Sequence, residues 1–254
     1  MSGHLAVIGL GPGDARYLTP EANAALKHAE VLYGYARYLE RTPLREGQAR
    51  HASDNREEGA RAVAALREAA LGARVGIVSG GDPGVFAMAA AVCEEIERGP
   101  ERFRALDVTI VPGVTAMLAV AARIGAPLGH DFCALSLSDN LKRRDVIERR
   151  LDAAAGAGFV IALYNPVSQS RPWQLGAAFD RLRRHLPAST PVVFGRAVGR
   201  ADETVTVTTI DCAGSAHADM ATLVIVGSRE TRLVERPGRA PLVYTPRSVV
   251  EVSA

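Results

Sequence analysis

Apolar runs of strand length alternate with helix-like patterns through the first half of the chain. Each run leads into a glycine turn, and apolar residues spaced three and four positions apart follow, as on the buried face of a helix. This alternation is typical of a parallel sheet covered by helices. The expected strands cover residues 5–10, 31–33, 74–78 and 108–111, and the expected helices cover 20–28, 54–71, 87–96 and an alanine-rich stretch after 116.

The second half shows several strands in a row, which indicates a mixed sheet. Thr and Val alternate through residues 203–210, a pattern typical of a half-exposed strand. We therefore expect two α/β domains, an N-terminal one at 1–112 and a C-terminal one at 113–254, with the active-site cleft between them. The other expected strands cover 132–137, 159–163, 192–195, 223–226 and an edge strand at 242–245, with helices at 145–155 and 174–186.

Composition fits one or two soluble domains and excludes several classes of protein. About half of the 254 residues are apolar, and no apolar run approaches the length that spans a membrane. The opening apolar run is too short for a signal peptide, so a cytoplasmic protein is expected. A net charge of +2 argues against a nucleic-acid partner. Three widely spaced cysteines predict neither a disulfide framework nor a metal site.

The basic residues are almost all of one kind. Apart from Lys27 and Lys142, the 30 basic residues are arginines. Arginine offers forked donors that suit carboxylates or phosphates wherever several converge on one pocket.

The stretch at 75–87 is the strongest local signal. A buried strand ends in Gly80 and Gly81, and Asp82 and Pro83 then suit the N-cap and first position of a helix. Glycines at the carboxyl end of a strand let the backbone approach a ligand, and ligands bind at that edge of α/β sheets. A plain strand-to-helix turn has the same local pattern, so the remaining motifs must decide between the two.

The glycine loop Gly-Leu-Gly-Pro-Gly-Asp at 9–14 is not a dinucleotide fingerprint. Asp14 occupies the slot of the third glycine, and Pro12 removes one backbone N–H from the turn. The second strand ends in Tyr-Gly-Tyr, where an acidic residue would hold a ribose. These features argue against NAD and against a Rossmann-type methyltransferase.

Three motifs carry a resemblance to the tetrapyrrole methylase family. They are the loop at 9–14 with Leu-Thr-Pro-Glu-Ala at 18–22, Ser-Gly-Gly-Asp-Pro-Gly-Val-Phe at 79–86, and Val-Pro-Gly-Val-Thr-Ala at 111–116. Further stretches at 31–35, 129–133, 136–139, 162–166, 195–200 and 226–231 resemble members of that family that act on precorrin-3B. The matches follow one order along nearly the whole chain. The chain departs from the usual Thr-Pro-Trp turn after Leu141, where it has Lys142, Arg143 and Arg144.

The resemblance implies a tetrapyrrole methylase-like fold that binds S-adenosyl-L-methionine and releases S-adenosyl-L-homocysteine. For Ala197, Ala221 and Thr222, ordinary packing at strand ends is an equal alternative to cofactor binding. By motif position the cofactor contacts are Pro12, Gly80, Gly81, Asp82, Val85, Thr115, Ala116, Asn165, Ala197, Ala221 and Thr222.

The implied reaction is methylation of precorrin-3B at carbon 17, with ring contraction to precorrin-4 in cobalamin biosynthesis. Contraction needs a proton acceptor and a proton donor, and Asp14, His130, Asp131 and Ser138 lie in matching motifs. His130 suits a helix cap or a core edge equally well. The substrate is an acidic tetrapyrrole, for which Arg37, Arg171 and Arg196 beside motif loops are the expected partners. The resemblance also implies a homodimer.

Other readings share some of these features. A sister methylase acting on another corrinoid or on uroporphyrinogen would have the same cofactor loops. A methylase acting on RNA or protein would too, although RNA binding favours a more basic surface. A non-enzymatic nucleotide-binding module leaves the separate strand-end motifs unexplained.

Overall fold

The computed structural model describes residues 3–54 and 56–248. The chain divides into two compact units, Met1–Ala116 and Met117–Ala254. The sequence predicts a boundary after Pro112, shortly before this division. Each unit is an α/β structure with its own sheet, which confirms the predicted fold class.

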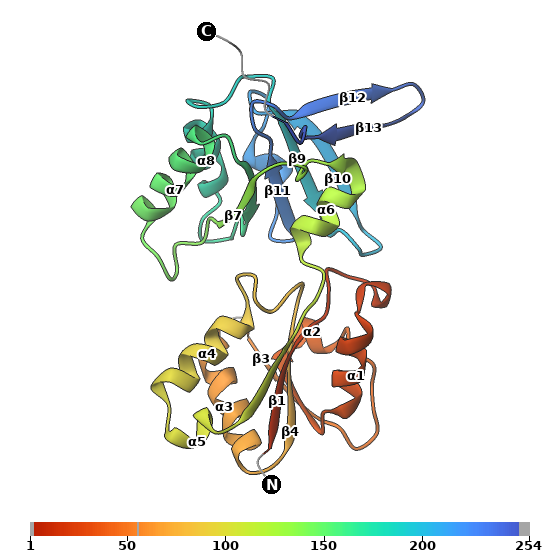
Figure 1. Cartoon of the computed structure of the whole chain (residues 1–254), viewed down its shortest axis with the longest axis vertical. Helices are drawn as coiled ribbons and strands as arrows, with labels where there is room; N and C mark the ends of the chain where they lie inside the picture. Colours follow the sequence, from red (N-terminus) through yellow and green to blue (C-terminus); the bar gives the residue numbers. More distant parts are fainter. Residues whose placement is uncertain (1–2, 55, 249–254) are drawn as a thin grey trace. The chain divides into compact units, whose positions relative to one another are not determined.

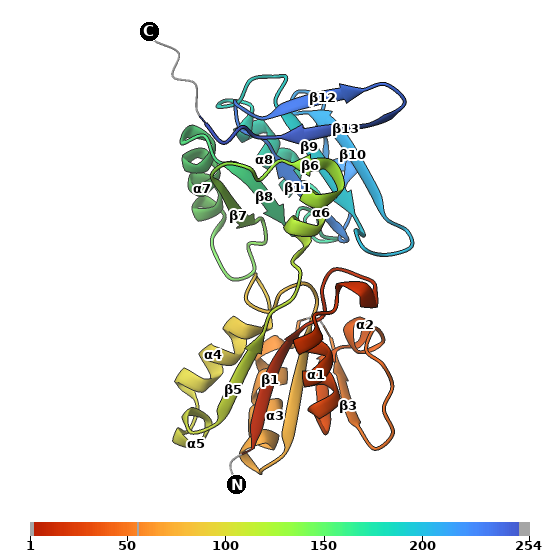
Figure 2. The same cartoon turned by 45° about the vertical axis from the view of Figure 1, so that its right-hand side comes forward.

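The first unit is built on a parallel five-stranded sheet of order β3-β2-β4-β1-β5 (Figure 1). Its helices lie on both faces of the sheet, with α1 and α2 on one face and α3, α4 and α5 on the other (Figure 2). The strands are β1 (His4–Gly9), β2 (Val31–Tyr35), β3 (Ala49–Ser53), β4 (Arg74–Ser79) and β5 (Asp107–Val111). The helices are η1 (Ala15–Tyr17), α1 (Pro20–His28), α2 (Ala36–Leu39), α3 (Glu58–Ala70), α4 (Met88–Arg98) and α5 (Glu101–Arg104).

The first unit has one hydrophobic core on each face of its sheet, and successive side chains of β1 point into the two cores in turn. Leu5 and Val7 pack with the helices α3 to α5, whereas Ala6 and Ile8 pack with α1 and α2. All four side chains are at most 3% exposed, so the strand is apolar throughout. Covering both faces in this way leaves the carboxyl edge of the sheet to the loops that follow β1, β4 and β5.

The second unit carries a mixed sheet of order β10-β9-β11-β8-β7. The strands β7 and β8 are parallel, while β11 runs antiparallel to β8 and β9, and β10 antiparallel to β9. A second, three-stranded sheet has the order β12-β13-β6. The strands are β6 (Gly125–Ala126), β7 (Phe132–Ser136), β8 (Val160–Tyr164), β9 (Pro191–Arg196), β10 (Thr204–Thr209), β11 (Thr222–Val226), β12 (Arg232–Arg236) and β13 (Arg239–Tyr244). The helices are α6 (Ala116–Ile124), α7 (Arg144–Gly156), α8 (Gln174–Leu182) and η2 (Ser215–His217).

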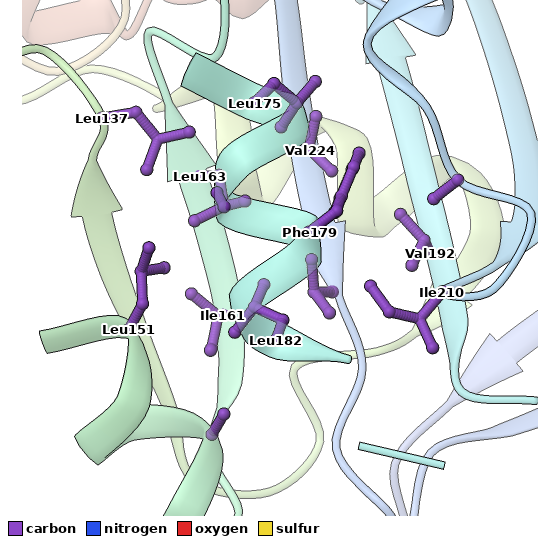
Figure 3. Close-up of a cluster of buried hydrophobic side chains, with 14 of the residues drawn as sticks. Leu137, Leu151, Ile161, Leu163, Leu175, Phe179, Leu182, Val192, Ile210 and Val224 are labelled. Atoms are coloured by element: carbon purple, nitrogen blue, oxygen red, sulfur yellow. The ribbon is translucent and has the colours of Figure 1, made fainter. Parts of the chain in front are cut away.

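The main core of this unit lies between the sheet and the pair α7 and α8. Leu175, Phe179 and Leu182 of α8 point onto Ile161 and Leu163 of β8 (Figure 3). On the other face α6 packs closely onto β9. A Cβ at Gly195 of β9 would lie only 2.3 Å from Val120 of α6. A glycine is therefore required where this helix crosses the strand.

Two predicted helix starts are wrong. The helix after β4 begins at Met88 with Ala87 as its N-cap, so neither Asp82 nor Pro83 starts a helix. The helix predicted from 54 begins at Glu58 with Glu57 as its N-cap, although the backbone N–H of Asp54 does donate to the Glu57 carboxylate at 3.1 Å. Within the described ranges, no helix combines the length and apolar character needed to cross a bilayer.

Candidate functional site

Two glycine loops of the first unit are joined by their backbones. Gly11 follows β1 and Gly81 follows β4, and the two exchange hydrogen bonds with N to O distances of 3.1 and 2.9 Å. Both residues have φ of +67°, a left-handed conformation that favours glycine. The glycines predicted from the sequence as a ligand loop therefore also fix the loop of the first motif.

The loop after β5 packs against the same two loops. A Cβ at Gly113 would lie 2.2 Å from the carbonyl oxygen of Gly81, and one at Gly9 would lie 2.8 Å from the Cα of Gly113. Since β4, β1 and β5 are neighbours in a parallel sheet, their carboxyl ends meet at one edge. Three chain segments thus approach one another there so closely that a Cβ at Gly9 or Gly113 would clash.

Asp82 connects the second and third loops instead of capping a helix. Its Oδ1 accepts from the N–H of Gly84 at 2.8 Å, and its Oδ2 accepts from the N–H of Gly113 at 3.1 Å. Both oxygens are thus used in holding backbone, which corrects the N-cap role predicted from the sequence. Hydrogen bonds to an ionised carboxylate are stronger than neutral ones, so this residue fixes the edge firmly.

The first-unit cofactor candidates surround this edge, and open space remains at Gly81. A Cβ on Gly81 would have no neighbour closer than the Cα of Thr115 at 3.7 Å. Thr115 is buried, while Pro12, Val85 and Ala116 are half-buried. The backbone at Gly81 is therefore open to a group that a side chain would otherwise displace.

The 82–87 turn also carries backbone strain. Phe86 has φ of +52° with its side chain 50% exposed, an unusual conformation for a residue with a Cβ. Such outliers gather at ligand sites, where surrounding structure holds them in place. The strain lies next to the predicted contact Val85.

Arg41 and Tyr38 belong to this edge but were not predicted from the sequence. Nη2 of Arg41 donates to the carbonyls of Gly11 and Gly13, each at 2.9 Å, and to that of Leu10 at 3.3 Å. A Cβ at Gly80 would meet the Cζ of Tyr38 at 2.7 Å. No sequence signal separates Arg41 from the other arginines, because it follows a short helix outside every motif.

The second-unit candidates gather at the edge where β7, β8 and β9 end. Asn165 follows β8 and Ala197 follows β9, with φ of +51° and +49°. The amide of Asn165 donates to Oγ of Ser136 at 2.9 Å, and the N–H of Ala197 donates to the carbonyl of Ala221 at 2.9 Å. Thr222 starts β11 opposite Arg196. The fold thus brings these candidates to one edge of one sheet.

Asp219 organises the β9 and β11 part of that edge. Its Oδ1 accepts from Thr222 and Ala221, and its Oδ2 accepts from Nε of Arg196 at 2.7 Å. Burial raises the pKa of this carboxyl, but the hydrogen bonds from Thr222, Arg196 and Ala221 outweigh that effect and lower it. The pKa of Arg196 is raised by hydrogen bonds to Asp219 and Asp202. Arg196 is therefore already engaged with two carboxylates.

Like Arg196, Arg171 is already bonded to other side chains. Its partners lie just before residues 142–144, the segment that departs from the family pattern. Its Nη1 donates to Oδ1 of Asp139 at 2.5 Å and to Oδ1 of Asn140 at 2.7 Å. Arg144, at the end of that segment, also has a partner, since its guanidinium lies 4.1 Å from the ring centroid of Trp173. By contrast, Arg37 is exposed on α2.

The four proton-transfer candidates lie in different units, one in the first and three in the second. Asp14 is exposed in the first unit and caps η1 by accepting from the N–H of Arg16 at 2.9 Å. In the second unit, Nδ1 of His130 lies 3.7 Å from the carboxylate of Asp131, and the N–H of Ser138 donates to Ser136 at 3.3 Å. No cluster of three or more metal-ligating side chains occurs among residues 3–54 and 56–248.

Known proteins place the chain in one family. The model of the Tetrapyrrole (Corrin/Porphyrin) Methylases matches residues 4–213. A precorrin-3B C(17)-methyltransferase of Sinorhizobium sp is 63% identical over 247 residues, which are 97% of this chain and 97% of that protein. A probable cobalt-factor III C(17)-methyltransferase of Salmonella typhimurium is 38% identical, over 95% of this chain and 99% of that protein.

A solved structure supports the same assignment. The crystal structure of the methyltransferase CobJ is 48% identical, covers 96% of this chain and 100% of its own, and has a TM-score of 0.91. The family model covers residues 4–213, and the relative and the solved structure extend the match over nearly the whole length. The chain therefore belongs to the tetrapyrrole (corrin/porphyrin) methylase family.

Proposed function

We propose that this protein is an S-adenosyl-L-methionine-dependent methyltransferase that methylates precorrin-3B at carbon 17, with ring contraction to precorrin-4 in cobalamin biosynthesis. The observation that carries the proposal is the 63% identity to the Sinorhizobium precorrin-3B C(17)-methyltransferase over 97% of both chains. Identity at this level along nearly the full length covers both units and every motif loop. The proposal therefore does not depend on any single motif.

The carboxyl edge of the first sheet has features that suit the methyl donor. Open space remains in front of the half-buried Gly81, and the bond between Asp82 and the N–H of Gly113 holds the surrounding loops. Pro12, Gly80, Gly81, Asp82, Val85, Thr115 and Ala116 would hold the donor in this unit, and Asn165, Ala197, Ala221 and Thr222 are proposed as its contacts in the second unit. When bound, the donor supplies a methyl group on a positively charged sulfur.

The residues of the chain then have three tasks. The glycine loops bind and orient the donor, because alignment of the two reacting atoms is most of what methyl transfer requires. The pyrrole carbon is itself electron-rich, so no side-chain nucleophile is needed. Ring contraction needs a proton taken and a proton given, and we propose Asp14, His130, Asp131 and Ser138 as the groups that do so.

A cobalt-factor III substrate is the second candidate. The specific observation in its favour is the 38% identity to the Salmonella relative over 99% of that protein. Its substrate name implies a cobalt-containing tetrapyrrole with the same methylation position. The lower identity ranks this reading second.

Two parallel incubations test both hypotheses. The protein is mixed with a labelled methyl donor and either precorrin-3B or cobalt-factor III, and the products are followed by mass and absorbance. We expect label in the precorrin-3B product, a mass gain of one methyl group and the absorbance change of a contracted ring. Preferred labelling of cobalt-factor III would reverse the ranking, and no transfer to either tetrapyrrole would refute the proposal.

We propose a homodimer as the working form, on the family resemblance alone. The chain mass is 26.9 kDa, so light scattering at working concentration should report about twice that value. A particle with the mass of a single chain would rule the dimer out.

A further inference from the structure

Arg41 gathers three carbonyl oxygens of the first glycine loop at one guanidinium nitrogen. The oxygens belong to Leu10, Gly11 and Gly13, at 3.3, 2.9 and 2.9 Å from Nη2. Carbonyl oxygens that converge repel one another unless a cation or donors lie among them. A positive charge at this point therefore stabilises a loop shape that neutral peptide units would not keep by themselves.

The same guanidinium is linked to the second glycine loop through Tyr38. Its Cζ lies 5.9 Å from the centroid of the Tyr38 ring, a cation–π distance. The ring in turn lies against Gly80, where a Cβ would approach the ring Cζ to 2.7 Å. Gly80 precedes Gly81, which is hydrogen-bonded to Gly11 in the first loop. Arg41 therefore contacts the first loop directly and the second loop through the Tyr38 ring.

The segment that carries Arg41 is itself held in place. Oγ1 of Thr42 donates to the carbonyl of Leu39 at 2.7 Å, and Thr42 is 5% exposed. Arg50 on β3 donates to the carbonyl of Leu39 at 3.2 Å and to those of Thr42 and Pro43. A rigid attachment lets one side chain position a loop, because little of its binding free energy is then spent on ordering its own backbone.

We propose that Arg41 is a positioning residue that fixes the loop at 9–14 against the loop at 80–82 and thereby sets the affinity for the methyl donor. This inference rests on the proposed function, since it takes the glycine edge as the donor site. Arg41 acts through the carbonyls of Leu10, Gly11 and Gly13 and through the Tyr38 ring.

The test uses the whole protein with Arg41→Met, Arg41→Lys and the matched control Arg74→Met. Arg74 lies at the opposite end of the same sheet, where it also donates to a backbone carbonyl, that of His28 at 3.2 Å, and pairs with Glu30 at 2.9 Å. Methionine keeps most of the stem length and removes every donor. Lysine keeps the charge but not the planar fork of donors that reaches the three carbonyls.

Hydrogen exchange of the unliganded proteins gives the first readout. In Arg41→Met the amides of Gly11 and Gly81, which bond to each other, should exchange about tenfold faster than in the wild type. Arg41→Lys should fall between the two, and Arg74→Met should match the wild type at both amides. Unchanged protection of Gly11 and Gly81 in Arg41→Met would overturn the inference.

Calorimetry with S-adenosyl-L-homocysteine gives the second readout. Affinity should fall about tenfold in Arg41→Met, less in Arg41→Lys, and not in Arg74→Met. Looser loops with full affinity would overturn the positioning role. If the wild type itself fails to bind the probe, the proposed function fails, whereas the exchange result still decides whether Arg41 holds the two loops. If Arg41→Met does not fold, the Arg41→Lys protein decides both points.

Discussion

Gly81 shows how much a single backbone position contributes to the proposed site. Its φ of +67° disfavours any residue with a Cβ, yet the nearest atom to such a Cβ would be 3.7 Å away. Strain and steric exclusion are therefore separable at this position. A substituent there would be tolerated by the neighbouring atoms and would occupy the open space in front of the loop.

We expect Gly81→Val to lose most of its affinity for S-adenosyl-L-homocysteine while remaining folded. The matched control is Gly47→Val, because Gly47 has φ of +76° and a Cβ there would have no atom within 4 Å. Both substitutions should cost about 1–2 kcal/mol of stability, the usual penalty for a left-handed residue with a Cβ. Only Gly81→Val should weaken binding by calorimetry, and equal affinities in the two variants would remove Gly81 from the site.

Tyr33 makes the stability of the first unit fall as pH rises through the alkaline range. Its hydroxyl donates to Glu68, and its ring stacks on His51 at 4.7 Å. Burial, followed by the hydrogen bond and charge of Glu68, raises the pKa of Tyr33 to about 12. The folded state thus holds this proton more tightly than the unfolded state. Its contribution to stability is complete below the ordinary value of 10.0 and is lost as pH rises through about 12.

We therefore expect Tyr33→Phe to flatten the loss of stability between those two pH values. Urea unfolding at a series of alkaline pH values measures the effect, and absorbance of the phenolate reports when the side chain ionises. Tyr35→Phe, from the same strand, serves as the control. Ionisation of all tyrosines in the wild type near the ordinary value would show that the pKa of Tyr33 is not raised.

At the scale of elements, Asp82 shows where local sequence rules give the wrong partner. Asp-Pro after a glycine pair is a standard helix start, but here the turn continues to Ala87 before α4 begins. The carboxylate instead bonds to Gly113, 31 residues further along the chain. Tertiary contact with a loop from a neighbouring strand decided the outcome, and no local pattern reports such a contact.

We expect Asp82→Asn to loosen the loop at 112–113, because an amide nitrogen cannot accept from the N–H of Gly113. The loss in stability should be about 0.5–1.5 kcal/mol, the net value of a typical hydrogen bond, because this bond is only partly buried. Asp14→Asn is the matched control, since its single bond to Arg16 needs only one oxygen acceptor. Thermal unfolding of the two variants measures the difference, and equal melting temperatures would contradict the bridging role.

Elements with strong apolar patterns were predicted well, and those without them were missed. The helix α1 covers Pro20–His28, the range predicted from the sequence, and Thr19 caps it through the N–H of Ala22. The strand β3 was missed because Ala-Arg-His-Ala-Ser has neither alternation nor apolar content, and it lies at the sheet edge with three of five residues exposed. The strand β12 was also missed, because its only apolar residues are the adjacent Leu233 and Val234, which show no alternation, and four of its five residues are exposed.

The backbone geometry of the candidate site could be predicted where glycine marks it. The motif glycines at 9–14, 80–81 and 113 are visible in the sequence, because left-handed φ values or close backbone approaches exclude most residues with a Cβ at such positions. Arg41 could not be found, since its role depends on three carbonyls that meet only in the folded chain. The left-handed conformations of Asn165 and Ala197 are likewise properties of the folded loops.

At the scale of the whole molecule, the net charge of +2 is too small to draw in an acidic substrate by itself. Recognition of a tetrapyrrole with several carboxylates must then come from individual donors. Arg171 and Arg196 are candidates, but each already bonds to carboxylates of the chain. Each guanidinium has five N–H donors, so these bonds do not exhaust its capacity.

We expect Arg171→Ala and Arg196→Ala to raise the KM for the tetrapyrrole about tenfold or more and to leave S-adenosyl-L-homocysteine affinity nearly unchanged, since a hydrogen bond to a charged group is worth about 1.5–3 kcal/mol. The matched variant is Asp139→Asn, which removes the carboxylate bound to Arg171 but keeps the arginine. If Arg171 meets the substrate, Asp139→Asn should keep a KM near that of the wild type. If the pair only holds the loop at 138–144, both variants should raise KM alike and lower the melting temperature alike. Esterified substrate should mimic Arg171→Ala in the wild type, and an ester that turns over as well as the free acid would exclude carboxylate recognition at these arginines.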